Sequence, residues 1–411
     1  MLQESIFKVL IGTFNVSNKN GKIYSILLLI VILLLIYSTL KFGKQYQNKQ
    51  SYKNSDAPNQ LIQMCMANPN SSLIGIMEDY RKKIDHNNSE IFKGKNLYMP
   101  CQYDDIDKEI SSLPNDENGI YFIIDSADQI AAKNLLWKNL VDYHGLSNAK
   151  MLSPETYALY DDKDKKRLEQ NHYDGKIYIL KKNIQRQHGL KITDSLQEIL
   201  NNNDNYIIAQ DLLQNPYLLN GYKINLRVYM LVICDKDKMH YFIYNDGFMY
   251  YTPKKFIKGT KEFDYNVTTG YVDRHIYEIN PLTIQDFIKY LDSDRELTEP
   301  ESDIRENNLS VSNVLFTRIL DLMRNIVVSF KGKICKSTCK IYNNVTYQVF
   351  GVDVAIDDKL YPQIMEINKG PDLTFKDERD GNVKKKMFLD IHKLLGILPN
   401  DNNGFMKIHC G

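Results

Sequence analysis

The chain has 411 residues, and 43% of them are hydrophobic, which is enough for a sizeable core in two or three domains. Its 52 lysine and arginine residues balance its 51 aspartate and glutamate residues, leaving a net charge of +1. Such a chain has no global field to attract nucleic acid, so we expect no nucleic-acid partner. The six cysteines show no paired framework. Cys335 and Cys339 stand alone as C-x3-C, which argues against a zinc site and favours free thiols in a reducing compartment.

The first distinctive segment along the chain is apolar. Residues 23–40 run without a charge between Lys22 and Lys41. As a helix, this segment would span roughly 27 Å, which is close to the hydrocarbon thickness of a bilayer. We therefore predict an N-terminal segment at 1–22, one uncleaved transmembrane helix at 23–40 and a polar tether at 41–60. A buried helix of a soluble domain is the alternative, which the all-round apolar character disfavours.

The next part of the chain, residues 61–172, is predicted to be a smaller N-terminal α/β domain. Its clearest elements are a strand at 121–124 and an amphipathic helix around residues 135–141. Two further strands are predicted beyond it, at 176–182 and at 206–213.

Two long strands, at 222–234 and 239–251, flank a four-residue polar turn and predict a β-hairpin. Side chains two apart on a strand share a face. Lys223, Asn225 and Arg227 are therefore expected to point the same way, with apolar neighbours pointing the other way.

The C-terminal half is predicted to contain two helices. Residues 292–310 are acidic and polar without a period, so we predict a loop there. Apolar residues recur at helical spacing in 311–330 and in 383–395, and Gly396 is expected to be the C-cap of the second helix.

Between these helices, strands at 347–357 and 362–368 carry hard oxygen donors. Alternation assigns the side chains of the second strand to two faces: Ile364, Glu366 and Asn368 to one, and Met365 and Ile367 to the other, toward a core. Asp353 can join Glu366 and Asn368 as a third donor. A few rigidly held oxygen ligands suit Mg²⁺ carrying nucleotide phosphates. A solvated surface hairpin is the alternative, which the apolar content of both strands disfavours.

These elements together have the parts of a nucleotide site. A strand ending in Lys181, a strand carrying Gln210, and a face carrying Lys223 and Arg227 precede the three oxygen donors. Antiparallel sheets that sandwich a nucleotide need cations for the phosphates, strand backbone for the base and acidic ligands for Mg²⁺. The spacing alone therefore predicts a magnesium–nucleotide site.

At these motifs the sequence resembles the tubulin–tyrosine ligase-like family of ATP-grasp enzymes. The matching text lies within residues 120–396 and reads Ile-Ala-Gln210-Asp-Leu-Leu-Gln-Asn-Pro, Gly221-Tyr-Lys223-Ile-Asn-Leu-Arg227, Phe-Gly-Val-Asp353 and Met-Glu366-Ile-Asn368. The resemblance implies an α+β protein with ATP-grasp-type antiparallel sheets flanked by helices. It also implies an enzyme that joins an amino acid to a protein carboxylate through an acyl-phosphate made from ATP.

The resemblance assigns roles to individual residues. Lys181 and Lys223 would contact the ATP phosphates, and Arg227 would contact the γ-phosphate or the acyl-phosphate. Arg227 and Lys223 would carry catalysis. The other nucleotide-binding positions would be Arg186 over the phosphates, Gln210, Asp211, Leu212 and Leu213 around the adenine, and Asn225. Mg²⁺ would be bound by Asp353, Glu366 and Asn368.

The sequence departs from the family pattern at several places. The phosphate-covering loop has a single glycine, Gly189. Four other positions carry a residue that differs from the usual one: Lys182 for proline, Asp211 for lysine, Asn225 for an acidic residue, and Tyr250 for arginine. Each departure is expected to weaken phosphate or substrate contact. A second interpretation therefore stays open, in which the protein is a nucleotide-binding pseudoenzyme serving as a membrane-attached scaffold.

The leading interpretation is a membrane-anchored ligase, dependent on ATP and Mg²⁺, that adds an amino acid to an acidic protein such as tubulin. Residues 173–396 would hold the ATP-grasp domains and 397–411 a tail. Lysines at 254–261 could attract an acidic acceptor, although a solvated basic loop is the simpler reading. Because four lysines follow the apolar segment and ATP is cytosolic, the catalytic domain is predicted to face the cytosol. A ligase for a small molecule or peptide is a third alternative.

Overall fold

The structure is a computed structural model, and it describes residues 62–64, 95–99, 103, 105–184, 189–398 and 401–410. The predicted N-terminal segment, transmembrane helix and tether lie outside the described residues. Within the described part of the chain, no helix is both long enough and apolar enough to cross a membrane. The transmembrane helix at 23–40 therefore stays a prediction.

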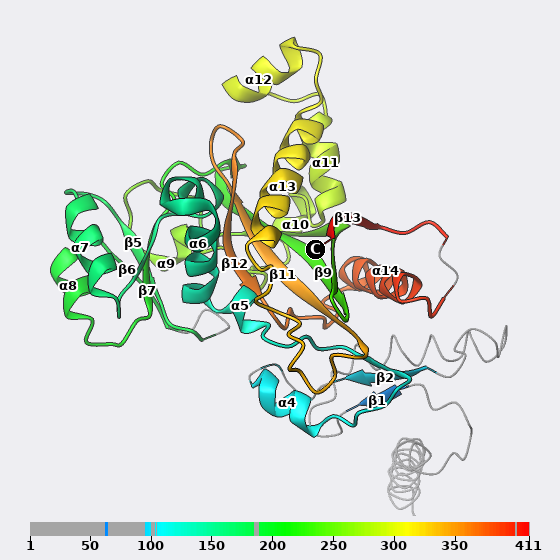
Figure 1. Cartoon of the computed structure of the whole chain (residues 1–411). Helices are drawn as coiled ribbons and strands as arrows, with labels where there is room; N and C mark the ends of the chain where they lie inside the picture. The colour runs from blue at the N-terminus through cyan, green and yellow to red at the C-terminus, as the bar shows by residue number, and fades with distance from the viewer. Residues whose placement is uncertain are drawn as a thin grey trace, which may run out of the picture. The chain divides into compact units, whose positions relative to one another are not determined.

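The fold is α+β, as predicted, with helices packed around two sheets (Figure 1). Over the described residues, the larger sheet contains β1 (Ile62–Met64), β2 (Asn96–Met99), β3 (Gly119–Tyr121), β8 (Leu218–Leu219), β9 (Tyr222–Asp235), β10 (Lys238–Tyr251), β11 (Val345–Ile356), β12 (Pro362–Asn368) and β13 (Phe405–Cys410). The smaller sheet has the order β4 (Thr156–Ala158), β7 (Ile208–Asp211), β5 (Tyr178–Lys181) and β6 (Leu190–Thr193).

The larger sheet is mixed, whereas the family resemblance implied antiparallel sheets. β1, β2, β3 and β11 pair in parallel one after another, whereas β11, β9, β10 and β13 pair antiparallel. β3 pairs only with the start of one edge of β11, and β12 pairs with a later part of the same edge. The parallel neighbours β3 and β11 come from distant parts of the chain, and no local spacing in the sequence reveals their pairing.

Both predicted hairpins are confirmed. β9 and β10 pair antiparallel from Asp235 and Lys238 at the turn, and β11 and β12 pair antiparallel beside them. Arg227, Asp353 and Glu366 are cross-strand neighbours in one row, because Asp353 pairs with Arg227 on one side and with Glu366 on the other. The segment predicted as a C-terminal tail contributes β13, which pairs with the outer edge of β10.

The predicted alternation along β12 is wrong in one respect. A β-bulge interrupts the pairing with β11, since Asp353 pairs with Glu366 but Val354 pairs with Ile364. The extra residue is Met365, and it shifts the alternation by one position. Glu366 and Asn368 keep the face of Asp353, as predicted. Ile364 and Ile367, which were assigned to opposite faces, are both buried on the other side.

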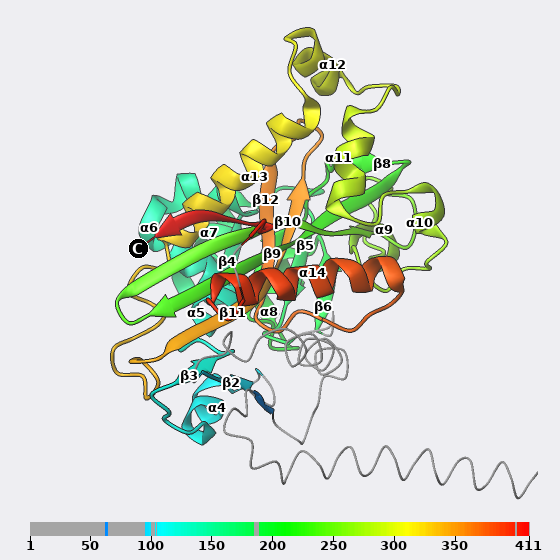
Figure 2. The ribbon, with the colours of Figure 1, turned by 90° about the vertical axis from the view of Figure 1, so that its right-hand side faces the viewer.

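Helices cover the larger sheet on both sides: α13 (Val311–Val328) lies on one face and α14 (Glu378–Leu394) crosses the other (Figures 1 and 2). Both were predicted, but α14 begins five residues early because Asp377 caps it with its side chain. Gly396 lies just beyond the C-cap residue Leu395, with a φ of 70°. The other described helices are α4 (Ile106–Ser112), α5 (Asp128–Ala131), α6 (Lys133–Leu152), α7 (Asp162–Asn171), α8 (Leu196–Asn201), α9 (Phe263–Asn266), α10 (Ile276–Ile279), α11 (Ile284–Asp292) and α12 (Glu299–Glu306).

Helix α12 corrects the prediction of a loop at 292–310. The sequence signal was a capping box, in which the Thr298 amide donates to Glu301 at 2.8 Å. Glu301 is fully buried and accepts further hydrogen bonds from Arg295 and from the hydroxyl of Tyr217. The acidic composition hid this helix because its central carboxylate is buried and paired, not solvated.

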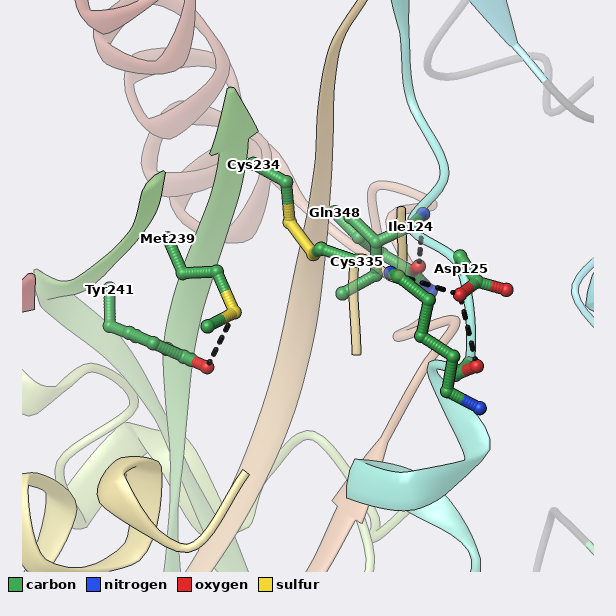
Figure 3. The surroundings of a disulfide bond; sticks show 9 residues. Ile124, Asp125, Cys234, Met239, Tyr241, Cys335 and Gln348 are labelled. Carbon is green, nitrogen blue, oxygen red and sulfur yellow. Dashed lines mark hydrogen bonds between the residues drawn. A yellow bond between two sulfur atoms is a disulfide. The ribbon is translucent and has the colours of Figure 1, made fainter. Parts of the chain in front are cut away.

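A disulfide joins Cys234, at the end of β9, to Cys335 in the segment between α13 and β11 (Figure 3). This corrects the expectation of free thiols for these two residues, whereas Cys339 is free. The two cysteines are 101 positions apart, and their Cα atoms lie 6.2 Å apart. The backbone amides of Cys335 and Lys336 both donate to Asp125, which fixes this segment beside the sheet.

Candidate functional site

The smaller sheet has one face packed against its own helices and one face turned toward β12. Leu168 of α7 and Ile199 of α8 pack with Tyr178 on the first face. Ile179 and Gln210 are paired across β5 and β7 and share the second face with Lys181 and Leu212. The second face is therefore apolar along most of its length and ends in a cation, an arrangement suited to a flat base followed by phosphates.

Lys181 lies between the two sheets. Its ammonium donates to Gln210 Oε1 at 2.7 Å and to the Met365 carbonyl of β12 at 3.5 Å. Burial lowers the pKa of Lys181 to about 8, although the negative charge of Glu366 acts to raise it. Gln210 in turn donates to the hydroxyl of Thr156 at 3.0 Å, which fixes its amide toward the lysine. The structure thus brings Lys181 and Gln210 together.

Lys223 is the most unusual cation of the site. It is 3% exposed, and its ammonium donates to the carbonyl of Leu213 at 3.3 Å. Over the described residues, no carboxylate forms an ion pair with it. Burial lowers the pKa of Lys223 to about 7, and the charge of Lys181 acts in the same direction. A buried amine without an anion has a desolvation cost that a bound phosphate would offset.

We expect Lys223→Met to stabilise the ligand-free protein at pH 7, by roughly 1–3 kcal/mol. The unfolded chain keeps the ordinary lysine pKa of 10.5, so between pH 7 and pH 10.5 it binds more protons than the folded chain. The unfolding free energy of the parent therefore rises with pH through this window, and the advantage of the variant fades. Chemical denaturation at pH 7 and pH 9.5 measures this difference.

The same variant is expected to lose most of its stabilisation by Mg-ATP, because the cation that would face the phosphates is gone. Lys258→Met, on an exposed position of the neighbouring loop, is the control and should change neither quantity. A Lys223→Met protein that is less stable than the parent at pH 7 would show that this lysine has a structural role instead.

Arg227 and Asp353 form a buried, bidentate ion pair. Arg227 Nε donates to one carboxylate oxygen at 2.6 Å and Nη2 donates to the other at 3.0 Å. The charge of Asp353 outweighs burial and raises the pKa of Arg227 above its ordinary value. The ring of Tyr250 lies 4.8 Å from Arg227 Cζ. A Cβ at Gly351 would lie 3.1 Å from Arg227 Nη1, so glycine at this position makes room for the guanidinium.

The three predicted metal ligands lie on one face of β11 and β12. Asn368 Nδ2 donates to Glu366 at 3.2 Å, which leaves the amide oxygen free to bind a ligand. Burial favours the neutral acid of Glu366, but the charges of Lys133 and Lys181 outweigh it and lower the pKa. Two adjacent carboxylates and an amide oxygen are a donor set that fits Mg²⁺. Among the described residues, no cluster of three or more His, Cys, Asp or Glu side chains is arranged to hold a metal.

The other predicted site residues lie in different places. Asp211 points away from Gln210 and pairs with Lys176 at 3.0 Å on the opposite face of the smaller sheet. Leu212 is buried on the apolar face, and Leu213 presents its carbonyl to a lysine. Asn225 shares the face of Arg227, and its buried Oδ1 has no hydrogen-bond donor among the described residues. Arg186 lies outside the described residues.

Sequence reasoning missed Lys133, at the start of α6. Its ammonium lies 3.9 Å from Glu366 and donates to the Ile184 carbonyl. The Lys133 backbone amide also donates to Asn183 Oδ1 at 3.2 Å, so the start of α6 is joined to the residues that follow β5. Ala131, Lys133, Leu136, Trp137, Ser153, Thr156, Ile208, Gln210, Met365, Glu366 and Ile367 line a pocket between α6 and the two sheets. Lys133 precedes Glu366 by more than 200 residues, so no local spacing connects them.

Comparison with known proteins shows the family of the chain. The sequence model of the tubulin-tyrosine ligase family matches residues 124–403. The chain belongs to the tubulin-tyrosine ligase family. The predicted family resemblance, within the ATP-grasp superfamily, is confirmed.

Individual relatives are distant. The chain is 27% identical over 224 residues to tubulin polyglutamylase TTLL7 of Xenopus tropicalis, covering 52% of this chain and 24% of the relative. It is 25% identical over 281 residues to the probable beta-tubulin polyglutamylase of Tetrahymena thermophila, covering 65% and 23%. It is 24% identical over 310 residues to the probable tubulin polyglutamylase TTLL9 of Rattus norvegicus, covering 73% and 58%. The chain thus matches about a quarter to just over half of the length of these relatives.

Proposed function

We propose that this protein is an ATP- and Mg²⁺-dependent ligase that joins an amino acid to a protein carboxylate. The observation that carries this proposal is Lys223, a buried ammonium without a described counter-charge, placed between two sheets beside Lys181 and the acidic row of Asp353 and Glu366. Membership of the tubulin-tyrosine ligase family supports the same chemistry.

In this mechanism, the acceptor carboxylate attacks the γ-phosphorus of ATP, ADP leaves, and an acyl-phosphate forms. The amine of the incoming amino acid then attacks the acyl carbon, releases phosphate and leaves an amide bond. Lys181 and Lys223 bind the phosphates. Arg227, which Asp353 holds in place, orients the transferred group. Asp353, Glu366 and Asn368 would hold Mg²⁺, which neutralises charge on the phosphates when bound. No nucleophilic side chain is needed.

The names of the relatives suggest the two co-substrates. These proteins are named tubulin polyglutamylases, so we propose glutamate as the amino acid and tubulin or another acidic protein as the acceptor. The basic loop at 254–261 gives this choice little support. Lys254 and Lys261 already pair with Asp264 and Asp194, at 3.2 and 2.9 Å.

A second candidate function is a nucleotide-binding scaffold without turnover. The observation that favours it is the bidentate pair, because both oxygens of Asp353 accept hydrogen bonds from Arg227. A ligase for a small molecule or peptide is a third candidate, because one fold can support several functions.

One experiment distinguishes the three functions. The full chain is incubated with Mg-ATP, labelled glutamate and tubulin or a cell extract, and both labelled protein and released phosphate are measured. Labelled protein supports the proposal. Phosphate release with label only in small molecules supports the third function. Stabilisation by Mg-ATP without phosphate release supports the scaffold. If Mg-ATP causes neither stabilisation nor phosphate release, the proposal is overturned.

We also propose that residues 23–40 anchor the protein in a membrane, with the ligase domain in the cytosol. The charge-free length and the following lysines support this topology. Alkaline carbonate should leave the full chain in the membrane pellet. Protease added to sealed vesicles should digest the ligase domain only when its cytosolic side is outside. Release by carbonate or a protected domain would contradict the anchor or its orientation.

A further inference from the structure

Two segments are joined beside Tyr250, next to the candidate site. One follows β10 and contains Gly270, Tyr271 and Arg274, and the other is residues 371–377, before α14. Tyr271 donates its hydroxyl to Asp372 at 3.2 Å, and Arg274 forms an ion pair with Asp377. Lys376 donates to the Gly270 carbonyl at 2.6 Å. The second segment contains one cation, Lys376.

Lys376 differs from the other cations in this region. Arg227, Arg274 and Lys384 each have a carboxylate partner, which is Asp353, Asp377 and Asp380 respectively. Over the described residues, the ammonium of Lys376 forms no ion pair. The ammonium contacts the Gly270 carbonyl and the face of the Tyr271 ring, whose centroid is 4.2 Å away. An ammonium has three donors, so it can still bind an anion.

Lys376 is also close to the candidate reaction centre. A Cβ at Gly270 would lie 2.8 Å from Tyr250 Cε1 and 3.2 Å from Lys376 Nζ. The ring of Tyr250 in turn lies 4.8 Å from Arg227 Cζ. Arg227, Tyr250 and Lys376 therefore follow one another outward from the acidic row. Tyr250 stands where the family pattern has an arginine, and burial raises its pKa, so it supplies no charge at neutral pH.

We propose that Lys376 binds a carboxylate of the incoming acidic amino acid and supplies the positive charge that Tyr250 lacks. This inference rests on the proposed function, and it makes Lys376 a residue that determines substrate specificity. The phenol of Tyr250 would lie beside the same carboxylate. Burial lowers the pKa of Lys376, although the negative charge of Asp372 acts to raise it. The positive charges of Lys384 and Arg274 lower this pKa further. An anion at this position would relieve that repulsion.

The test compares the full chain with Lys376→Met and Lys376→Arg, with Lys385→Met as a control on an exposed position of α14. With tubulin and Mg-ATP, the Met variant should raise the KM for glutamate at least about tenfold and leave the KM for ATP unchanged. The Arg variant should recover most of this loss. The control should match the parent in both constants and in melting temperature.

Several outcomes would overturn the inference. An unchanged KM for glutamate would do so. If the Met variant has a lower melting temperature and the KM values for glutamate and ATP rise equally, Lys376 serves to hold the two segments together instead. A second readout does not need turnover: stabilisation by glutamate, measured with Mg²⁺ and a non-hydrolysable ATP analogue. The parent should show it and the Met variant should not. If the parent shows no stabilisation, the inference fails. If it shows stabilisation without transfer, the proposed function fails and the binding site stands.

Discussion

Replacing Glu366 with glutamine is expected to remove most of the thermal stabilisation that Mg-ATP gives this protein. The substitution keeps the shape of the side chain but takes one of two adjacent carboxylates out of the proposed metal shell. At ligand concentrations about 100 times Kd, the parent should gain roughly 2.7 kcal/mol from binding, and the variant should lose most of it. Thermal denaturation with ATP, with and without Mg²⁺, measures the effect.

Glu378→Gln is the matched control, because Glu378 is an exposed carboxylate in the first turn of α14. It should respond to Mg-ATP like the parent. Glu366 also faces Lys133 at 3.9 Å, so the ligand-free stability of Glu366→Gln must be recorded as well. A variant that Mg-ATP stabilises as fully as the parent would show that Glu366 does not bind the metal.

Replacing Arg227 with lysine is expected to lower kcat by roughly 100- to 1,000-fold while the protein stays folded. The guanidinium uses Nε and Nη2 to hold Asp353 and keeps Nη1 beside Gly351. A lysine ammonium is a point charge and cannot hold the carboxylate at two points while also contacting a phosphate. Phosphate release and melting temperature, measured on the same samples, separate the two effects.

Arg324→Lys, in an exposed ion pair on α13, is the control for a generic arginine-to-lysine change and should not affect kcat. Arg227→Met should behave differently from both, because it leaves Asp353 buried without its partner, at a cost of roughly 3–5 kcal/mol. The ion pair thus gives Arg227 a role in stability besides its proposed role in catalysis. Unchanged turnover in Arg227→Lys would contradict the catalytic assignment.

Elements whose signals lie close together in the sequence were predicted well. The β9–β10 and β11–β12 hairpins each have a short turn between two periodic strands, and α13 has a continuous apolar face. In each case the apolar residues recur with the period of a strand or a helix over a short stretch, which is enough to predict the element. Helix α12 and the first turn of α14 were missed because polar and acidic residues form them. Their stability comes from caps and from pairs such as Arg295 with the buried Glu301.

The sequence by itself determined the family, the two hairpins and the shared face of Asp353, Glu366 and Asn368, because strand alternation and turn position are local properties. Only the tertiary structure decided the β-bulge at Met365, the pairing of Cys234 with Cys335, the approach of Lys133 to Glu366, and the place of Lys376 beside Tyr250. Each of these brings together residues from separate elements, or depends on how two strands align. Burial and pairing across such distances are set by the packing of the whole chain, which no short stretch of sequence encodes.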